Sequence, residues 1–412
     1  MICVEEAQKR ILDSVRPLGV ETVNLLDAMG RVIGEDVHAG RAIPAWDNSA
    51  MDGYALRAVD TAGASPQHPV YLEVIETIPA GSVPSKRIGP GQAARIMTGA
   101  PMPEGADAVV MLEDCHQDAG RVAILVEAVD GRHIRRMGDD VPLGEEILSR
   151  GDTIRPADIG LLASLGRSTV PVHRRPLVAV VATGSELTEI DEAPSPGKIV
   201  GSNRYTLAAL VGECGAIPLL LGIAQDRRED LAAAFRNAMQ ADLIVSAGGV
   251  SGGDFDLVKD IMQAEGNRLF FWQVAMKPGK PLAFGALGEV PIVGLPGNPA
   301  SSMVCFEQFV RPAILKMLGH GNFFRRTVLA RLSEGIKKKR GFRHFVPAQL
   351  RRDADGCIVA MAGKLGAGMI KSMVRANGLI IIPEETEAVG AGETVTVQVL
   401  DDSLDRCPEP GY

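Results

Sequence analysis

Four loops rich in glycine or acidic residues carry the clearest potential for chemistry. Each follows an apolar run, and they are ATGSEL (182–187), AQDRRE (224–229), SAGGVSGGDFD (246–256) and GLPGNPASS (294–302). Glycine lets backbone N–H groups approach a ligand closely, and a helix N-terminus carries partial positive charge. Two glycine-rich loops that lead into helices therefore predict a site for phosphate or another oxyanion, although neither matches GxGxxG or GxxxxGK[ST].

Carboxylates stand inside these loops, at Glu186, Asp226, Asp254 and Asp256. Carboxylates beside a phosphate usually share a divalent cation with it, and Mg²⁺ is the natural candidate. Each acid also has a simpler interpretation. Asp226 and Glu229 have the spacing of a helix capping box, the two later aspartates can favour a helix dipole, and Glu186 can be a solvated loop acid. The position of all four loops after strands favours the metal interpretation.

Two lysines, Lys277 and Lys280, lie in the segment MKPGKP (276–281). The proline and glycine between them disfavour regular structure, so the segment can hold both cations on a stiff frame. Because the chain has a net charge of -8, such a pair would form a local positive spot for an anion. A solvated hairpin turn is the alternative.

The segment PAWDNSAMDGYAL (44–56) places small polar residues between Trp46 and Tyr54 in a chain with only two Trp and four Tyr. Asp-Asn-Ser and Asp-Gly are good turn formers, so the aromatics can simply anchor a loop to the core. Alternatively, a loop fixed by its aromatics presents Asp52 to a ligand. These residues alone do not separate the two interpretations.

The bulk composition bounds the class of protein. With 412 residues, 46% hydrophobic and 23% charged, the chain is that of a soluble protein with several domains. Its acidic net charge argues against broad binding to nucleic acid or acidic membranes. The six scattered cysteines fit free thiols in a reducing compartment, and the N-terminus does not read as a signal peptide. We therefore expect a cytoplasmic protein without a membrane span.

The pattern of elements predicts an α/β multidomain protein. Buried strands alternate with helices over residues 176–318, which indicates a doubly wound, largely parallel sheet, with Asn203 as the cap of one helix. Residues 41–139 read as a β-rich insertion into a segmented N-terminal α/β domain formed by residues 1–40 and 140–175. Residues 319–412 read as a separate C-terminal β domain. Ligands of such a sheet bind beyond the carboxyl ends of its strands, where the four loops lie.

Six segments together resemble one family. DNSAMDGYA, RIMTGAPMPEGADAVV, VVATGSEL, SAGGVSGGDFD, MKPGKP and GLPGNPAS occur in this order and resemble the molybdopterin molybdenumtransferases, MoeA, whose eukaryotic relatives are the gephyrin E-domain proteins. The resemblance implies a molybdopterin-binding α/β domain and a homodimer whose active site is shared between subunits. It implies insertion of molybdenum into adenylylated molybdopterin with release of AMP. Mg²⁺ is the implied cofactor, and adenylylated molybdopterin and molybdate are the implied substrates.

The resemblance also assigns residues to the site. Those implied to act in catalysis are Asp52, Thr98, Asp140, Glu186, Asp226 and Asp256, and of these Glu186, Asp226 and Asp256 would hold the metal. Those implied to bind substrate are Ser49, Thr183, Gly184, Gly248, Gly249, Ser251, Lys277, Lys280, Pro296, Gly297, Asn298 and Pro299. Lys277 and Lys280 would hold molybdate or phosphate, and amides of the glycine loops would contact the pterin phosphate.

One departure from the family pattern concerns the C-terminal domain. Family members often have Ser-Gly where this chain has Ala367-Gly368. If that hydroxyl contacts substrate, its absence weakens the role of this domain and leaves room for a paralogue with altered activity.

Two alternatives accompany the molybdenumtransferase hypothesis. A molybdopterin adenylyltransferase would consume ATP, but the β insertion and the C-terminal domain do not fit a lone enzyme of that kind; a transient contact with such an enzyme is expected instead. A gephyrin-like scaffold would tolerate Asp256→Asn, whereas an enzyme would not.

Overall fold

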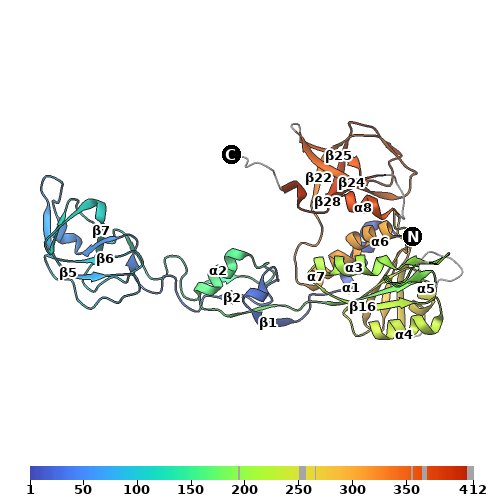
Figure 1. Cartoon of the computed structure of the whole chain (residues 1–412), viewed down its shortest axis with the longest axis horizontal. Helices are drawn as coiled ribbons and strands as arrows, with labels where there is room; N and C mark the ends of the chain where they lie inside the picture. Colours follow the sequence, from blue (N-terminus) through green and yellow to red (C-terminus); the bar gives the residue numbers. More distant parts are fainter. Residues whose placement is uncertain (194, 250–256, 265, 354–355, 364–368, 406–412) are drawn as a thin grey trace.

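The computed structural model spans residues 1–412 and describes all of them except 194, 250–256, 265, 354–355, 364–368 and 406–412. The chain is elongated, with a small β structure at one end and a larger α/β body, capped by a second β structure, at the other (Figure 1). The predicted α/β multidomain class is confirmed. The boundaries given above for the four domains stay predictions.

The α/β body contains a six-stranded sheet in the order β16-β13-β17-β21-β20-β18. The first four strands are parallel: β16 (Ile217–Ala224), β13 (Leu177–Thr183), β17 (Leu243–Ala247) and β21 (Val290–Leu295). The last two are antiparallel: β20 (Ala283–Leu287) and β18 (Asn267–Trp272). Strands β13 and β17 are almost wholly buried, because helices cover both of their faces.

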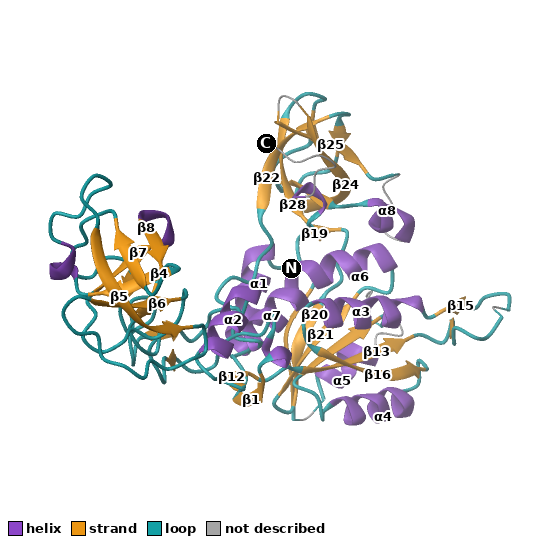
Figure 2. Cartoon of the chain, turned by 60° about the vertical axis from the view of Figure 1, so that its left-hand side comes forward, coloured by secondary structure: helices purple, strands orange, loops and turns teal. Residues whose placement is uncertain are grey.

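The two faces of this sheet have separate apolar cores. On one face pack α1 (Val4–Ser14), α3 (Ser202–Glu213), α6 (Pro299–Cys305), a π-helical turn (Phe306–Val310) and α7 (Arg311–Met317). On the other face pack α4 (Arg228–Ala238) and α5 (Leu257–Met262), as Figure 2 shows. Helix α1 thus belongs by its contacts to the α/β body, although the strands that follow it in the chain do not.

At the end of the molecule opposite the α/β body lies the small β structure, called here the far β structure, with a sheet in the order β7-β4-β6-β5-β9-β8. Its strands are β4 (Gly53–Leu56), β5 (Val70–Ile78), β6 (Gln92–Ile96), β7 (Ala108–Met111), β8 (Cys115–Asp118) and β9 (Arg121–Ile124). Alternate side chains of these strands fill two apolar clusters, one on each face. This part of the molecule therefore has its own core.

A narrow segment joins the two ends. It holds three antiparallel pairs, β1 (Val20–Asn24) with β12 (Thr169–His173), β2 (Val37–His38) with β11 (Glu146–Leu148), and β3 (Asn48–Ser49) with β10 (Ile134–Arg135). Helix α2 (Pro156–Ser164) packs on it. In the first two pairs one strand precedes residues 41–139 and the other follows them, whereas β3 and β10 both lie within that range.

The C-terminal β structure has a sheet in the order β19-β24-β25-β22-β28-β26, with a further pairing of β24 to β26. Its own strands are β22 (Thr327–Leu332), β24 (Arg343–Asp353), β25 (Gly356–Met361), β26 (Gly378–Ile382) and β28 (Thr394–Val399). Strand β23 (Ile336–Lys337) pairs with β27 (Ala388–Val389), and helix α8 is Ile370–Arg375. Strand β19 (Met276–Lys277) belongs to the α/β body in sequence yet pairs with β24.

Two expectations from composition can be compared with the described residues. Within them, no helix is long and apolar enough to cross a membrane. Cys3, Cys115, Cys214, Cys305 and Cys357 are free, as expected, and Cys407 lies outside the described residues.

Candidate functional site

The glycine-rich loops meet at the carboxyl edge of the parallel strands. Gly248, directly after β17, donates its backbone N–H to the Leu295 carbonyl at 3.0 Å. Its φ is +100°, and a Cβ on it would lie 2.3 Å from the Thr183 carbonyl oxygen. A Cβ on Gly297 would in turn lie 3.7 Å from the Gly248 Cα. The loops after β13, β17 and β21 are therefore in contact, and only glycine fits at 248.

The loop after β16 joins this edge through Asp226. Its Oδ2 accepts the Ser185 N–H at 2.9 Å, and the Ser185 hydroxyl accepts the Asp226 N–H at 3.1 Å. The capping-box interpretation of Asp226 is wrong, because α4 has Arg227 at its N-cap and no side-chain cap. The carboxylate instead fixes the loop of the neighbouring strand.

Glu186 belongs to the same cluster. A Cβ on Gly184 would lie 2.5 and 2.7 Å from the two Glu186 carboxylate oxygens, so this side chain folds back over the exit of β13. Glu186 and Asp226 thus lie on loops that Ser185 ties together. Oxygen donors of this kind are the ligands that Mg²⁺ takes, so the described part of the predicted metal site has suitable chemistry. Asp256, Asp254 and Ser251 lie outside the described residues.

Asn203 is a further residue of this edge, which the sequence pattern predicts only as the cap of a helix. That prediction is wrong, because Gly201 occupies the N-cap position of α3. The Asn203 Nδ2 instead donates to the Gly297 carbonyl at 2.7 Å. Asn203 therefore fixes the loop that precedes α6, where Pro296 is buried and Gly297 and Asn298 are exposed.

The other substrate-binding candidates of this region flank the loop contacts. Thr183 is buried at the end of β13, where its hydroxyl lies 3.5 Å from the Ala247 carbonyl. Gly249 has φ +66° and follows Gly248. Pro299 is the first residue of α6, and the preceding Asn298 uses no side-chain atom to cap the helix. The Asn298 amide is therefore exposed at the same edge as the glycine amides.

The lysine segment lies at the seam between the α/β body and the C-terminal β structure. Lys277 and Lys280 are both exposed. Gly279, between them, has φ +106°, and a Cβ there would lie 2.3 Å from the Cys305 Sγ on α6. The Lys280 Nζ lies 5.9 Å from the centre of the Phe342 ring. The backbone of this segment is thus packed tightly while its two cations reach solvent.

Asp52 and Thr98 form a second cluster, in the far β structure. Asp52 Oδ1 accepts the Thr98 N–H at 2.7 Å and the Thr98 hydroxyl at 2.9 Å. These two hydrogen bonds, the backbone one first, lower the pKa of Asp52, and the charge of Arg95 adds to the effect. Asp52 is therefore a fixed and ionised carboxylate on an exposed turn.

Ser49 and Asp140 complete the candidates at this end. Ser49 is fully buried, and its hydroxyl donates to the Met51 carbonyl at 2.5 Å. This hydrogen bond stabilises the turn that carries Asp52. Asp140 is exposed and its N–H donates to the Ile43 carbonyl at 3.0 Å. Both residues lie on the segments that connect the far β structure to the rest of the chain.

The two aromatic residues of this turn behave differently. Tyr54 is 1% exposed and fills the core, as an anchor should. Trp46 is 55% exposed, so the expectation that both rings anchor the loop is wrong for Trp46. The neighbouring Asp47 does the anchoring instead, since its carboxylate accepts from Arg136 Nη1 and from the Met137 N–H, both at 2.8 Å. Sequence could not distinguish these roles, because both rings flank the same polar run.

Within one chain the two clusters do not meet. Asp52 and Thr98 lie in the β structure at one end of the molecule, and Glu186, Asp226 and the glycine loops lie in the α/β body at the other (Figure 1). The narrow segment with α2 separates them. A single site that uses both clusters therefore requires a second copy of the chain.

Family models cover most of the sequence. Residues 2–166 match the MoeA N-terminal region (domain I and II), residues 179–316 match a probable molybdopterin binding domain, and residues 329–400 match the MoeA C-terminal region (domain IV). The matches follow one another along the chain in the order of the structural regions described above.

Similarity to individual proteins extends over nearly the full length. The chain is 41% identical over 403 residues to molybdopterin molybdenumtransferase 2 of Mycobacterium tuberculosis, covering 96% of this chain and 99% of that protein. It is 37% identical over 404 residues to the molybdopterin molybdenumtransferase of Bacillus subtilis, covering 97% and 94%. A crystal structure of the molybdopterin biosynthesis MoeA protein from Pyrococcus horikoshii OT3 has a TM-score of 0.81 at 32% identity, covering 97% of this chain and 100% of that one.

Proposed function

We propose that two protomers of this chain share each catalytic site. The chain itself belongs to the MoeA family and is a molybdopterin molybdenumtransferase. The enzyme inserts molybdenum into molybdopterin. In the proposed reaction the substrates are adenylylated molybdopterin and molybdate, and AMP is released. The observation that supports a shared site is the separation of the Asp52 cluster from the glycine loops within one chain.

The glycine loops of one protomer bind the phosphates. Gly297 is exposed at the N-terminal end of α6, and the half-buried Gly249 follows the exit of β17, where backbone N–H groups favour an anion. Gly248 shapes the loop, because its own N–H is donated to the Leu295 carbonyl. Asn203 keeps the Gly297 carbonyl turned away from the phosphate, because that oxygen accepts its side-chain amide. Repulsion between a carbonyl oxygen and a phosphate oxygen is thereby avoided.

Release of AMP is a hydrolysis. The oxygen of a water molecule forms a bond to phosphorus, the bridging P–O bond breaks, and a proton of the water must be taken up. Asp52 of the second protomer is suited to orient that water, because its hydrogen bonds from Thr98 hold it in position and in the ionised form. Glu186, Asp226 and Asp256 would hold Mg²⁺, which when bound neutralises charge on the phosphate oxygens.

Lys277 and Lys280 bind the molybdate oxyanion. Both are exposed cations on a tightly packed backbone, so they offer positive charge at a defined place. In the transfer that follows, the two dithiolene sulfurs form bonds to molybdenum, one Mo–O bond breaks, and that oxide leaves as water with the two thiol protons, so the metal stays at its oxidation state. Fixed positive charge of this kind lowers the energy of anionic states without rearrangement during the reaction.

Mixed dimers provide the test. Asp52→Asn and Asp226→Asn should each abolish AMP release from adenylylated molybdopterin with molybdate and Mg²⁺. A re-associated equal mixture should regain about a quarter of wild-type activity, because half of the dimers are mixed and each contains one intact site. If each site lay within one chain, no mixture would regain activity, and the shared-site proposal would be wrong. AMP release by the wild type without molybdate would contradict the coupled reaction.

A further inference from the structure

We propose that His344, from the C-terminal β structure, is a binding residue for the oxyanion that Lys277 and Lys280 hold. The inference rests on the proposed function of that lysine segment and adds to it a residue from another region of the chain. The ligand chemistry is a tetrahedral dianion, supplied either as free molybdate or as a phosphate group of the substrate.

The first support is the pairing of β19 with β24. The strands are parallel, Met276 is opposite Arg343, and Lys277 is opposite His344. Paired residues of adjacent strands project from the same face of a sheet. Met276, like Phe345, faces the core of the α/β body, so Lys277 and His344 both project from the opposite face.

The second support is the charge around His344. Lys277 comes from β19, Lys338 comes from the segment before β24, and the neighbour on β26 is the apolar Ile382. Burial and the charges of Lys338 and Lys277 lower the pKa of His344 to about 4. Glu384, Glu385 and Glu387 lie near Lys338 and offset part of its charge, and Glu384 is also paired with Arg343 at 3.1 Å. The charges that act on His344 itself are those of Lys338 and Lys277, so its surroundings favour an anion.

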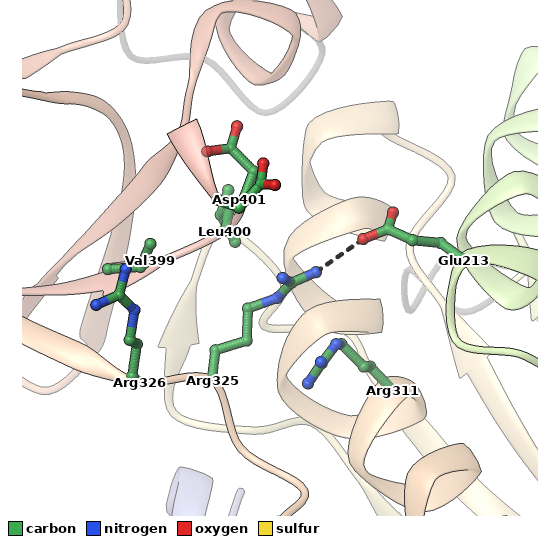
Figure 3. A pocket seen from close by; sticks show the side chains of 8 residues that line it. Glu213, Arg311, Arg325, Arg326, Val399, Leu400 and Asp401 are labelled. Atoms are coloured by element: carbon green, nitrogen blue, oxygen red, sulfur yellow. Dashed lines mark hydrogen bonds and ion pairs between the residues drawn. The ribbon is translucent and has the colours of Figure 1, made fainter. Parts of the chain in front are cut away.

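The third support is that these groups are held in position. The Lys338 Nζ donates to the carbonyls of Phe342 at 2.9 Å and Glu384 at 3.0 Å, and the Lys280 cation lies over the Phe342 ring. The orientation of the C-terminal β structure is itself fixed at the other side of the seam. There Arg325 binds Glu307 at 2.8 Å. It also binds Glu213 at 3.2 Å, beside a cavity of about 420 Å³ that both residues line (Figure 3). His344 therefore stands in a fixed place beside Lys277.

A neutral imidazole in this position donates an N–H to the anion and becomes easier to protonate once the anion is bound. An approaching dianion favours the imidazolium, so binding raises the pKa of His344 and takes up a proton. The affinity for the dianion should accordingly increase as the pH falls toward the pKa of the complex. Without His344 this part of the pH dependence should disappear.

The experiment measures binding of sodium molybdate to the full-length protein by calorimetry, and of inorganic phosphate in a parallel series. His344→Gln should weaken binding of one or both anions about tenfold and remove the rise in affinity between pH 8 and pH 6. The exposed His68, on the far β structure, serves as the matched control, and His68→Gln should bind like the wild type. A loss for one anion alone identifies it as the occupant, and a loss for both shows that the site takes either tetrahedral anion.

A second measurement uses the unaltered protein, so it stands even if His344→Gln folds poorly. The imidazole signals of His344 in an NMR spectrum should shift, and its pKa should rise, when molybdate or phosphate is added. Unchanged signals together with unchanged affinity of His344→Gln for both anions would overturn the proposal. Anion binding can be measured without turnover. A failure to detect AMP release would therefore contradict the proposed reaction but would not affect the test of His344.

Discussion

The two β structures of this chain are attached to the rest of the molecule in opposite ways. The C-terminal one has an apolar cluster of its own, but it also contributes Phe345, Met373 and Leu379 to the cluster that holds α1 and α6 of the α/β body. It also takes β19 from that body into its own sheet. The far β structure fills its clusters with residues 54–134 alone and is connected through short strand pairs.

Buried polar contacts follow the same division. At the C-terminal seam, Glu307 is paired with Arg325, and Gln308 Nε2 donates to Gln398 Oε1 at 2.6 Å, all in buried surroundings. Arg343 links Glu5 of α1 with Glu384 of the C-terminal structure. Such contacts tolerate little displacement, because an unpaired buried charge or amide is costly. The comparison indicates that the C-terminal β structure is held rigidly against the α/β body, at the interface that carries the lysine segment. The position of the far β structure depends instead on the narrow segment of short strand pairs.

The largest expected effect is on the shared apolar core. Phe345→Ala should destabilise the protein by about 3–5 kcal/mol, because the cavity opens between the two regions. Hydrogen exchange should then speed up in both the α/β body and the C-terminal β structure. As the matched change, Leu72→Ala should speed exchange only in the far β structure. Faster exchange confined to the C-terminal structure in Phe345→Ala would contradict a shared core.

The buried ion pair should come next. Among the described residues, Arg325→Ala leaves the 6% exposed Glu307 carboxylate with Arg311 as its remaining cation, at 3.9 Å, and we expect the free energy of unfolding to fall by about 3 kcal/mol in denaturant titrations. Arg340→Ala is the control, because its partner Glu387 is 64% exposed, and it should change stability by less than about 0.5 kcal/mol. Equal effects of the two changes would show that the seam does not depend on this pair.

A smaller effect is expected from the buried amides. Gln398→Ala removes the acceptor of the Gln308 side chain, and the loss should be about 1–2 kcal/mol. Replacing both glutamines by leucine should restore part of that loss, since no buried amide is then left unpaired. Unfolding by denaturant of the single and double variants measures the coupling between them. Strict additivity would mean that the contact has no energetic role at the seam.

The smallest effect concerns the far β structure alone. The pKa of Asp52 is lowered by its hydrogen bonds from Thr98, so the stabilisation is present above the ordinary aspartate pKa and is lost as the pH falls through the lowered value. Thr98→Val removes the hydroxyl donor and should move the pKa of Asp52 back toward its ordinary value in an NMR titration. Thr77→Val, at an exposed position of β5 in the same β structure, is the control. Neither variant should change the rate of hydrogen exchange in the C-terminal β structure or in the α/β body.

Local patterns in the sequence carried much of the prediction. The alternation of buried strands and helices indicated the doubly wound sheet, because the period of apolar residues differs between the two kinds of element. The same pattern placed Glu186, Asp226 and the glycine loops after parallel strands, and hence at one edge. The partners of side chains were harder to predict. Asp226 bonds to Ser185 rather than to its own helix, and Asn203 bonds to Gly297 rather than capping α3.

What the sequence alone determined, then, is the order of the elements, the loops that carry glycine, acid and lysine, and the family to which they belong. Only the tertiary structure decided that α1 packs on a body encoded far downstream, that Trp46 faces solvent, and that β19 pairs with β24. The physical reason is that apolar period and turn chemistry act over a few residues, whereas pairing between positions 277 and 344 depends on how whole domains pack. That pairing is what brings His344 beside Lys277.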